Sequence, residues 1–283
     1  MRSSLVAFLV LVDLLVCASC GENTTPEPRV PYSGTPTQLT CVPNLDGVIT
    51  SDELGAAYGI SIDFLISPQG TERTVSPLGV VASDGGRVWD WGEDHADDQA
   101  LRLSPEPLGT QWYADHFPGA QLVLPLDALG ETVGVYSRTQ SAFIVHGTAS
   151  RDPDPPNGRT LLVYEDPIAL FRFPLEDGQA YTASSTITNG LLFGLPFAGR
   201  HTYEVALDGT GELLLPQLTF TLVQRVTTRF IVEPAIGNPA TVRQIGFVFE
   251  CFGEVARATS RTGETDPNFT TAAEVRRVGQ SLF

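Results

Sequence analysis

The sequence predicts a mainly β protein built on one large curved antiparallel sheet, half-barrel or sandwich-like, with few short helices. Long alternation of apolar and polar residues, frequent turn signals and scarce helical periodicity support this prediction. The clearest alternation places apolar side chains at even positions only: Leu218, Phe220, Leu222, Val226, Phe230 and Val232. At about 3.3 Å per residue this strand would be about 50 Å long, a length typical of large curved sheets, unless a bulge at Gln224 divides it.

The first half of the folded region is expected to contain one short helix and several strands. Residues 52–58 have the pattern of one or two helical turns. The next segment alternates with period two, and its apolar members are Tyr58, Ile60, Ile62, Phe64 and Ile66. Further strands are expected at residues 75–82, 87–91, 120–126, 133–136 and 143–147, where apolar residues again alternate or run between turn signals.

The second half begins with a clear break. Residues 151–159 are rich in Pro, Asp, Asn and Gly, which predicts a long loop or a linker between two β subdomains. Strands are expected at residues 161–164, 168–173, 203–207 and 245–251. The sequence Asp-Gly-Thr-Gly at 208–211 predicts a turn after residue 207. Residues 271–278 are expected to form a short C-terminal helix.

The N-terminus has the features of a secretion signal. Arg2 precedes an apolar run from Leu5 to Val16, too short for a comfortable membrane span, and small residues then lead to Cys20. This arrangement resembles the lipobox of bacterial lipoproteins, although Cys17 stands where Leu is usual. The resemblance implies that acyl chains on Cys20 anchor the protein in a membrane. The alternative is an ordinary secretory signal that leaves Cys20 as a free thiol.

Together these patterns divide the chain into four parts. Residues 1–19 form the lipoprotein signal peptide, and residues 20–39, rich in Thr, Pro, Glu and Gly, form a flexible tether. Residues 40–260 form the β-rich domain, and residues 261–283 a C-terminal tail with a short helix. Gly21 follows the cysteine instead of Asp, which by resemblance to enterobacterial sorting favours the outer membrane of the cell envelope.

Composition excludes several functions. The net charge of −16 disfavours binding to nucleic acid or to anionic lipid headgroups. The chain has no lysine, since all 17 basic residues are arginine, and this excludes Schiff-base chemistry, a Walker lysine and a Ser-Lys dyad. Cys41 and Cys251 lie near the two ends of the folded region. In an exported protein they are expected to form a disulfide, with two buried thiols as the alternative.

One segment has the spacing of a calcium-binding loop. Residues 42–53 resemble an EF-hand loop, with Asn44 third, Asp46 fifth and Glu53 twelfth. Calcium is therefore a candidate cofactor. The pattern departs from an EF-hand at Val42, which cannot ligate through its side chain, and Pro43 lies inside the loop. The alternative is a turn at Asp46-Gly47 followed by a capping box of Thr50 and Glu53.

Two other groups of residues are candidates for chemistry. The acidic run at 93–98 lies beside Trp89 and Trp91, so it is a candidate site for a divalent cation or for a sugar stacked on the tryptophans, with a solvated loop as the alternative. His116 is a candidate acid or base. No local motif marks a nucleophile, a phosphate loop or a zinc site, so we assign no catalytic residue.

Two stretches carry a further resemblance. The segment from Cys41 to Gly47, taken with that from Phe249 to Arg257, resembles lipoproteins of myxobacterial type, and the hairpin pattern of residues 208–226 resembles secreted proteins of unassigned role. The resemblance covers about residues 41–257. It implies placement in the cell envelope and adds no information about catalysis.

These observations favour a membrane-anchored, non-enzymatic lipoprotein whose concave sheet holds an apolar ligand, by analogy with half-barrel lipoprotein carriers. One alternative is an envelope scaffold that meets a protein partner through the outer face of residues 217–229. A second is a hydrolase of dispersed residues around His116, Asp115 and Glu93. A carrier requires an unfilled apolar cavity, and a scaffold requires a filled core. A hydrolase requires a cleft in which His116 lies within hydrogen-bonding distance of a carboxylate.

Overall fold

The computed structural model describes residues 41–57, 59–83, 85–127 and 129–279. The expected signal peptide, tether and lipidated Cys20 lie outside the described residues. The prediction of a mainly β fold is confirmed, because one sheet of fifteen strands dominates the domain. Among the described residues, no helix combines the length and hydropathy of a membrane span.

The large sheet is antiparallel apart from one pair of strands. Its main path runs β5-β1-β17-β15-β14-β13-β12-β11-β10-β9-β8-β7-β6, and β4 pairs in parallel with β12 and antiparallel with β3. The first strands are β1 (Ile62–Ile66), β3 (Val80–Val81), β4 (Arg87–Asp90), β5 (Gln99–Leu103), β6 (Glu106–Pro107) and β7 (Leu122–Pro125). The longer strands are β8 (Thr132–Arg138), β9 (Ala142–Ser150), β10 (Leu161–Arg172), β11 (Ala180–Leu192), β12 (Leu195–Leu214), β13 (Thr219–Pro234), β14 (Ala240–Phe249), β15 (Gly253–Thr259) and β17 (Glu274–Val278).

Three smaller elements complete the fold. The strands β2 (Arg73–Thr74) and β16 (Thr271–Ala272) pair with each other. The helix α1 (Ser51–Ala57) confirms the helical turns expected near residue 52, and a single 3₁₀ turn, η1, covers Ala114–His116.

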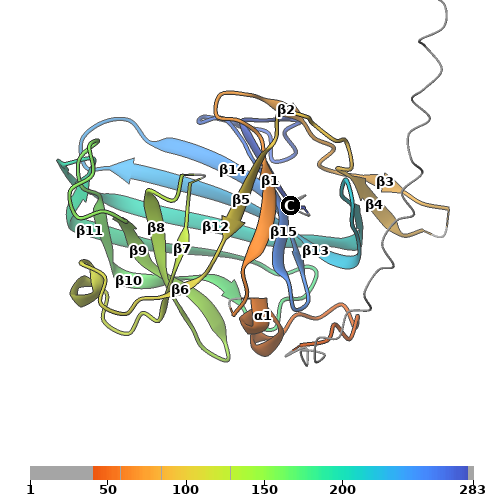
Figure 1. Cartoon of the computed structure of the whole chain (residues 1–283), viewed down its shortest axis with the longest axis horizontal. Helices are drawn as coiled ribbons and strands as arrows, with labels where there is room; N and C mark the ends of the chain where they lie inside the picture. Colours follow the sequence, from red (N-terminus) through yellow and green to blue (C-terminus); the bar gives the residue numbers. More distant parts are fainter. Residues whose placement is uncertain (1–40, 58, 84, 128, 280–283) are drawn as a thin grey trace, which may run out of the picture. The chain divides into compact units, whose positions relative to one another are not determined.

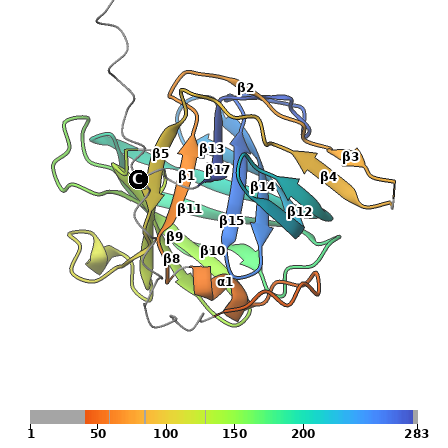
Figure 2. The same ribbon diagram turned by 45° about the vertical axis from the view of Figure 1, so that its right-hand side comes forward.

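The sheet curls so that the two ends of its strand order approach each other (Figures 1 and 2). Side chains of β1 and β5, at one end, line the same cavity as side chains of β7 and β8, at the other. The edge strands β5 and β6 do not pair with each other, so the sheet stays open. Its strands therefore present a concave face to this cavity and a convex face to the opposite side.

Both faces of the sheet carry buried side chains, so the second half of β14 is a continuous run of buried residues. On β14, Gly246 and Val248 line the cavity, whereas Ile245 and Phe247 belong to a second core with Trp89 and Trp91. The ring centroid of Phe247 lies 5.0 Å from that of Trp89 and 5.0 Å from that of Trp91. A third core packs the segment around η1 against β7, β8 and β9 through Tyr113, Phe117, Val123, Val133 and Val135.

The expected turn at residues 208–211 is wrong. The strand β12 continues through this segment, where its pairing with β13 shifts register on either side of Thr210 and Gly211. Such shifts mark bulges, and glycine suits them because it tolerates close backbone approach. A Cβ added to Gly211 would lie 2.2 Å from the carbonyl oxygen of Arg87. The glycine therefore allows β4 to pair alongside β12.

The expected C-terminal helix is also wrong. Residues 274–278 form β17, which lies between β1 and β15 in the sheet, and residues 271–272 form β16. Tertiary pairing overrides the helix propensity of Ala and Glu here. Of the two interpretations of residues 151–159, the structure shows the loop and not a linker between subdomains, because the segment joins the paired strands β9 and β10 within one unit, Leu39–Phe283.

The predicted disulfide is present. Cys41 and Cys251 are bonded, with their Cα atoms 5.6 Å apart and a sequence separation of 210. Next to it, the carboxylate of Glu250 accepts hydrogen bonds from the backbone N–H groups of Asn44 and Leu45, at 2.7 and 2.8 Å. The bond therefore joins the first described segment to the turn after β14.

Candidate functional site

The concave face of the sheet encloses a cavity of about 550 Å³. This volume lies within the range of about 300–1,000 Å³ that is typical of small-molecule sites. Its wall is contributed by nearly every long strand, which is possible only because the sheet curls. The apolar part of the wall includes Ile62, Phe64, Leu103, Leu124, Phe143, Leu162, Phe171, Phe197, Val205, Val226, Phe230 and Val248.

Aromatic rings form much of this wall. Tyr203 and Phe230, on the paired strands β12 and β13, have ring centroids 4.6 Å apart, and Tyr136 stacks on Phe143 at 5.0 Å. Phe197, Tyr203 and Phe230 are only half-buried, because one side of each ring faces open space. Apolar surface that remains uncovered in a folded domain is available to a ligand.

One small polar cluster interrupts the apolar wall. The hydroxyl of Tyr164 lies 2.9 Å from Nδ1 of His201 and 3.5 Å from the hydroxyl of Tyr203. Burial lowers the pKa of His201 to about 4, so the imidazole is neutral at pH 7. Burial also raises the pKa values of Tyr164 and Tyr203, so both phenols stay protonated. The cluster is therefore uncharged, and its hydroxyl groups can form hydrogen bonds with a neutral ligand.

We expect His201 to make the protein sensitive to acid. The pKa of its imidazole is lower in the folded state than the ordinary value of 6.5, so its contribution to stability is present above pH 6.5 and is lost as the pH falls towards 4. For one such group the loss between pH 7 and pH 5 is about 2 kcal/mol. Urea unfolding of the wild type and of His201→Gln at pH 7 and pH 5 measures this loss of stability. The variant should lose about 2 kcal/mol less than the wild type, and equal losses would refute the assignment.

Charged side chains meet the cavity on β15 and β17. Arg257 and Arg276 are register partners on these strands, and both line the cavity together with Glu254. Arg276 donates through Nε and Nη2 to Glu274, at 2.9 and 2.6 Å. Desolvation lowers the pKa of Arg276, and the nearby charge of Arg257 lowers it further. This is the only part of the described wall that contributes formal charges.

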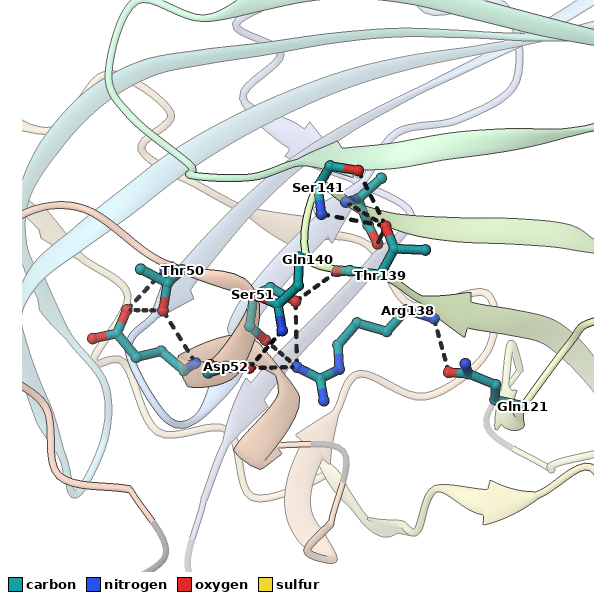
Figure 3. Close-up of polar contacts among 10 residues, drawn as sticks. Thr50, Ser51, Asp52, Gln121, Arg138, Thr139, Gln140 and Ser141 are labelled. Carbon is teal, nitrogen blue, oxygen red and sulfur yellow. Dashed lines mark hydrogen bonds and ion pairs between the residues drawn. The ribbon is translucent and has the colours of Figure 1, made fainter.

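The helix α1 is fixed to the turn between β8 and β9, next to the cavity wall (Figure 3). Arg138 donates through Nη1 to the carbonyl oxygen of Ser51 at 2.6 Å and lies 3.3 Å from Oδ1 of Asp52. The hydroxyl of Ser51 donates to the carbonyl oxygen of Thr139 at 2.7 Å. Leu54 of α1 is fully buried in the same cluster as Tyr136 and Phe143, so the helix packs against side chains of the cavity wall.

The residues of the expected calcium loop make local hydrogen bonds. The side chains of Asn44 and Asp46 bond to each other and to the backbone of their own turn. Glu53 accepts hydrogen bonds from the backbone N–H and hydroxyl of Thr50, both at 2.8 Å, which is the capping-box alternative. Within the described ranges, no three His, Cys, Asp or Glu side chains gather in a way that would hold a metal ion.

The acidic run beside the tryptophans has a structural role. Trp89 and Trp91 are buried in the second core, so neither offers a face for sugar stacking. Asp98 pairs with Arg277 at 2.5 Å, and only 5% and 3% of the two side chains are exposed. Asp97 and Asp98 also bind Arg73, at 2.6 and 3.1 Å. The interpretation of the run as a solvated loop is therefore wrong for Asp98.

The other candidate groups do not assemble into a site. His116 is exposed on η1, and its side chain makes no hydrogen bond to any residue that the structure describes. On the outer face of β13, Arg225 is buried and donates to Asp208 at 2.5 Å and to Asn268 at 2.9 Å. Arg229 pairs with Glu204 at 3.1 Å. Much of the outer face assigned to a partner is thus occupied within the chain itself.

Sequence reasoning did not identify the residues of the cavity. Of the even-numbered apolar side chains expected on one buried face, Val226, Phe230 and Val232 line the cavity, whereas Phe220 lies in the second core and Leu222 is exposed. The arginines were missed, although Arg257 is flanked by small and apolar residues in a strand, Val255-Ala256-Arg257-Ala258. A charged residue within an otherwise apolar strand can indicate a polar side chain in the wall of a cavity.

Comparison of the chain with protein-family models, with curated proteins and with solved structures finds no match.

Proposed function

We propose that the protein is an exported lipoprotein, held in the cell envelope by acyl chains on Cys20, whose β domain binds an apolar ligand without transforming it. The observation that carries this proposal is the cavity of about 550 Å³ on the concave face, with its largely apolar and aromatic wall. A cavity of this chemistry in water favours an apolar occupant, because each buried CH₂ group contributes about 0.8 kcal/mol.

The cavity favours this function over the two alternatives. A scaffold would need a filled core, whereas Phe197, Tyr203 and Phe230 on the concave face remain half-buried. A hydrolase around His116 would need a carboxylate within hydrogen-bonding reach of the imidazole. His116 is exposed and has no such partner within the described ranges.

Two features support the proposed location. The sequence before the domain resembles a lipoprotein signal with Cys20 as the modified residue. The bond between Cys41 and Cys251 is typical of proteins that fold in an oxidising compartment, such as the bacterial periplasm. An anchored domain with an internal apolar cavity could take up lipid-like molecules at a membrane and shield them from water.

Native mass spectrometry tests the binding function directly. The protein is purified from a bacterial envelope and measured before and after extraction with organic solvent. We expect a stoichiometric apolar adduct that extraction removes, together with a clean apo mass afterwards. An apo mass before extraction, and no uptake of added oleyl alcohol by the extracted protein, would overturn the proposal.

A further inference from the structure

The charged part of the cavity wall is built from two adjacent strands. Arg257 of β15 and Arg276 of β17 face each other in register, and both contribute to the wall. On the other side of β15, the register partner of Arg257 is Gly246 of β14, which also lines the cavity. Because Gly246 has no side chain, the carboxylate of Glu254 can lie over it, 3.5 Å from where a Cβ would be, so only this acidic side chain occupies the space there.

Several N–H donors of the two arginines lack acceptors. Nε of Arg257 is buried and has no hydrogen-bond partner among the described residues. Within the same part of the chain, its side chain makes one hydrogen bond, from Nη1 to Glu254, with a length of 3.5 Å. Arg276 uses Nε and Nη2 for its own bonds, which leaves Nη1 without a partner among the described residues. Buried donors of this kind usually have an acceptor, from the protein or from a bound molecule.

Two carboxylates lie close to the arginines, and they differ in how firmly they are held. Glu274 makes two short bonds to Arg276. Glu254 approaches Arg257 only at 3.4 Å, although 31% of the side chain is exposed in both carboxylates, so the difference lies in the length of their bonds to arginine. Glu254 can therefore turn towards solvent when another anion approaches Arg257, whereas Glu274 stays in place.

We infer that the ligand is an amphiphile with an anionic oxyacid head, and that Arg257, with Arg276 beside it, binds that head inside the cavity. This inference rests on the proposed function and adds the chemical class of the ligand. A guanidinium presents paired donors that match a carboxylate or phosphate, and charge-assisted bonds of this kind are among the stronger hydrogen bonds. The apolar chain would extend from the arginines across β14, β13 and β12 along Val226, Phe230 and Phe197, which line the same cavity.

A pair of probes with the same chain and different heads tests the inference. Oleic acid and oleyl alcohol compete at pH 8 with a fluorescent apolar dye bound to the purified protein. We expect the acid to bind about 10- to 100-fold more tightly than the alcohol, the range set by a charge-assisted hydrogen bond. Oleoyl lysophosphatidate, compared with oleate, shows which oxyacid head the arginines prefer.

Two substitutions provide matched changes of opposite sign. Arg257→Gln should reduce the affinity for oleate at least tenfold and leave the affinity for oleyl alcohol unchanged. Glu254→Gln removes the competing carboxylate, so it should increase the affinity for oleate severalfold and again leave the alcohol unchanged. If Arg257→Gln fails to fold, Glu254→Gln alone still gives a signed result.

The outcomes separate the two proposals. If the wild type binds acid and alcohol equally, or if Glu254→Gln weakens oleate binding, the cavity is apolar without a site for an anionic head, and this inference fails while the proposed function stands. If neither probe binds, the proposed function itself fails.

Discussion

Replacing Asp98 by Asn is expected to lower the free energy of unfolding by about 3–5 kcal/mol, the typical cost of removing one partner from a buried ion pair. Asp98 and Arg277 are almost fully buried and lie 2.5 Å apart. The other bonds of Arg277 go to the carbonyl oxygens of Trp91 and Glu93, at 2.7 and 2.6 Å. In Asp98→Asn the guanidinium keeps these neutral acceptors and loses its countercharge.

Asp97→Asn is the matched control for this prediction. Asp97 belongs to the same acidic run and also binds Arg73, but 56% of its side chain is exposed. Exposed ion pairs contribute about 0–1 kcal/mol, so this variant should remain within about 1 kcal/mol of the wild type. Guanidinium chloride unfolding at pH 7 measures both proteins. Equal losses in the two variants would contradict the structural role assigned to Asp98.

Removing the disulfide is expected to have an effect of similar size. The double variant Cys41→Ser, Cys251→Ser should be less stable by about 2–5 kcal/mol, because the bond restricts a long loop in the unfolded chain. The bond joins residues separated by 210 positions and holds the segment before α1 against the turn after β14. Unfolding of the wild type in the presence of a reductant provides a second route to the same loss.

The reductant also provides the control. The double variant has no bond between these positions to reduce, so its unfolding midpoint should not change when reductant is added. The wild type should lose stability to about the level of the variant. A wild type that is unaffected by reduction would show that the bond contributes nothing to the stability of the domain.

Local patterns in the sequence predicted which side chains share a face. The structure confirms this for β13 from Val226 onwards but not before it, because Phe220 belongs to the second core and Leu222 is exposed. The even-numbered residues Val226, Phe230 and Val232 line the cavity, as period two requires. The same reasoning failed at residues 208–211, where an Asp-Gly turn signal lies inside β12, because the partner strands β4 and β13 keep the backbone extended there. The types of residue in a short segment do not reveal which distant strands pair with it.

The cavity could not be predicted from short segments of the sequence. It exists because the sheet curls until β1 and β5 come close to β7 and β8, and that curvature depends on the register of all the strands between them. The position of Arg276 was missed for a related reason. A short segment with Ala and Glu suggests a helix, whereas pairing with both β1 and β15 makes it a central strand.

Two neighbouring threonines of β13 allow the most direct test of ligand binding in the cavity. Thr228 lines the cavity, whereas Thr227 follows the opposite alternation and its hydroxyl bonds to the carbonyl oxygen of Ala206. The substitution Thr228→Phe should fill part of the cavity, and Thr227→Phe should place the same ring on the outer face. The dissociation constant of oleyl alcohol, a neutral probe, is measured for both variants and the wild type.

Excluding two or three CH₂ groups of the probe costs about 2 kcal/mol, or about 30-fold in affinity. We therefore expect Thr228→Phe to bind oleyl alcohol about 30-fold more weakly than the wild type, and Thr227→Phe to bind it within about threefold of the wild type. Equal affinities for all three proteins, with unchanged melting curves, would contradict the claim that the concave cavity is the binding site.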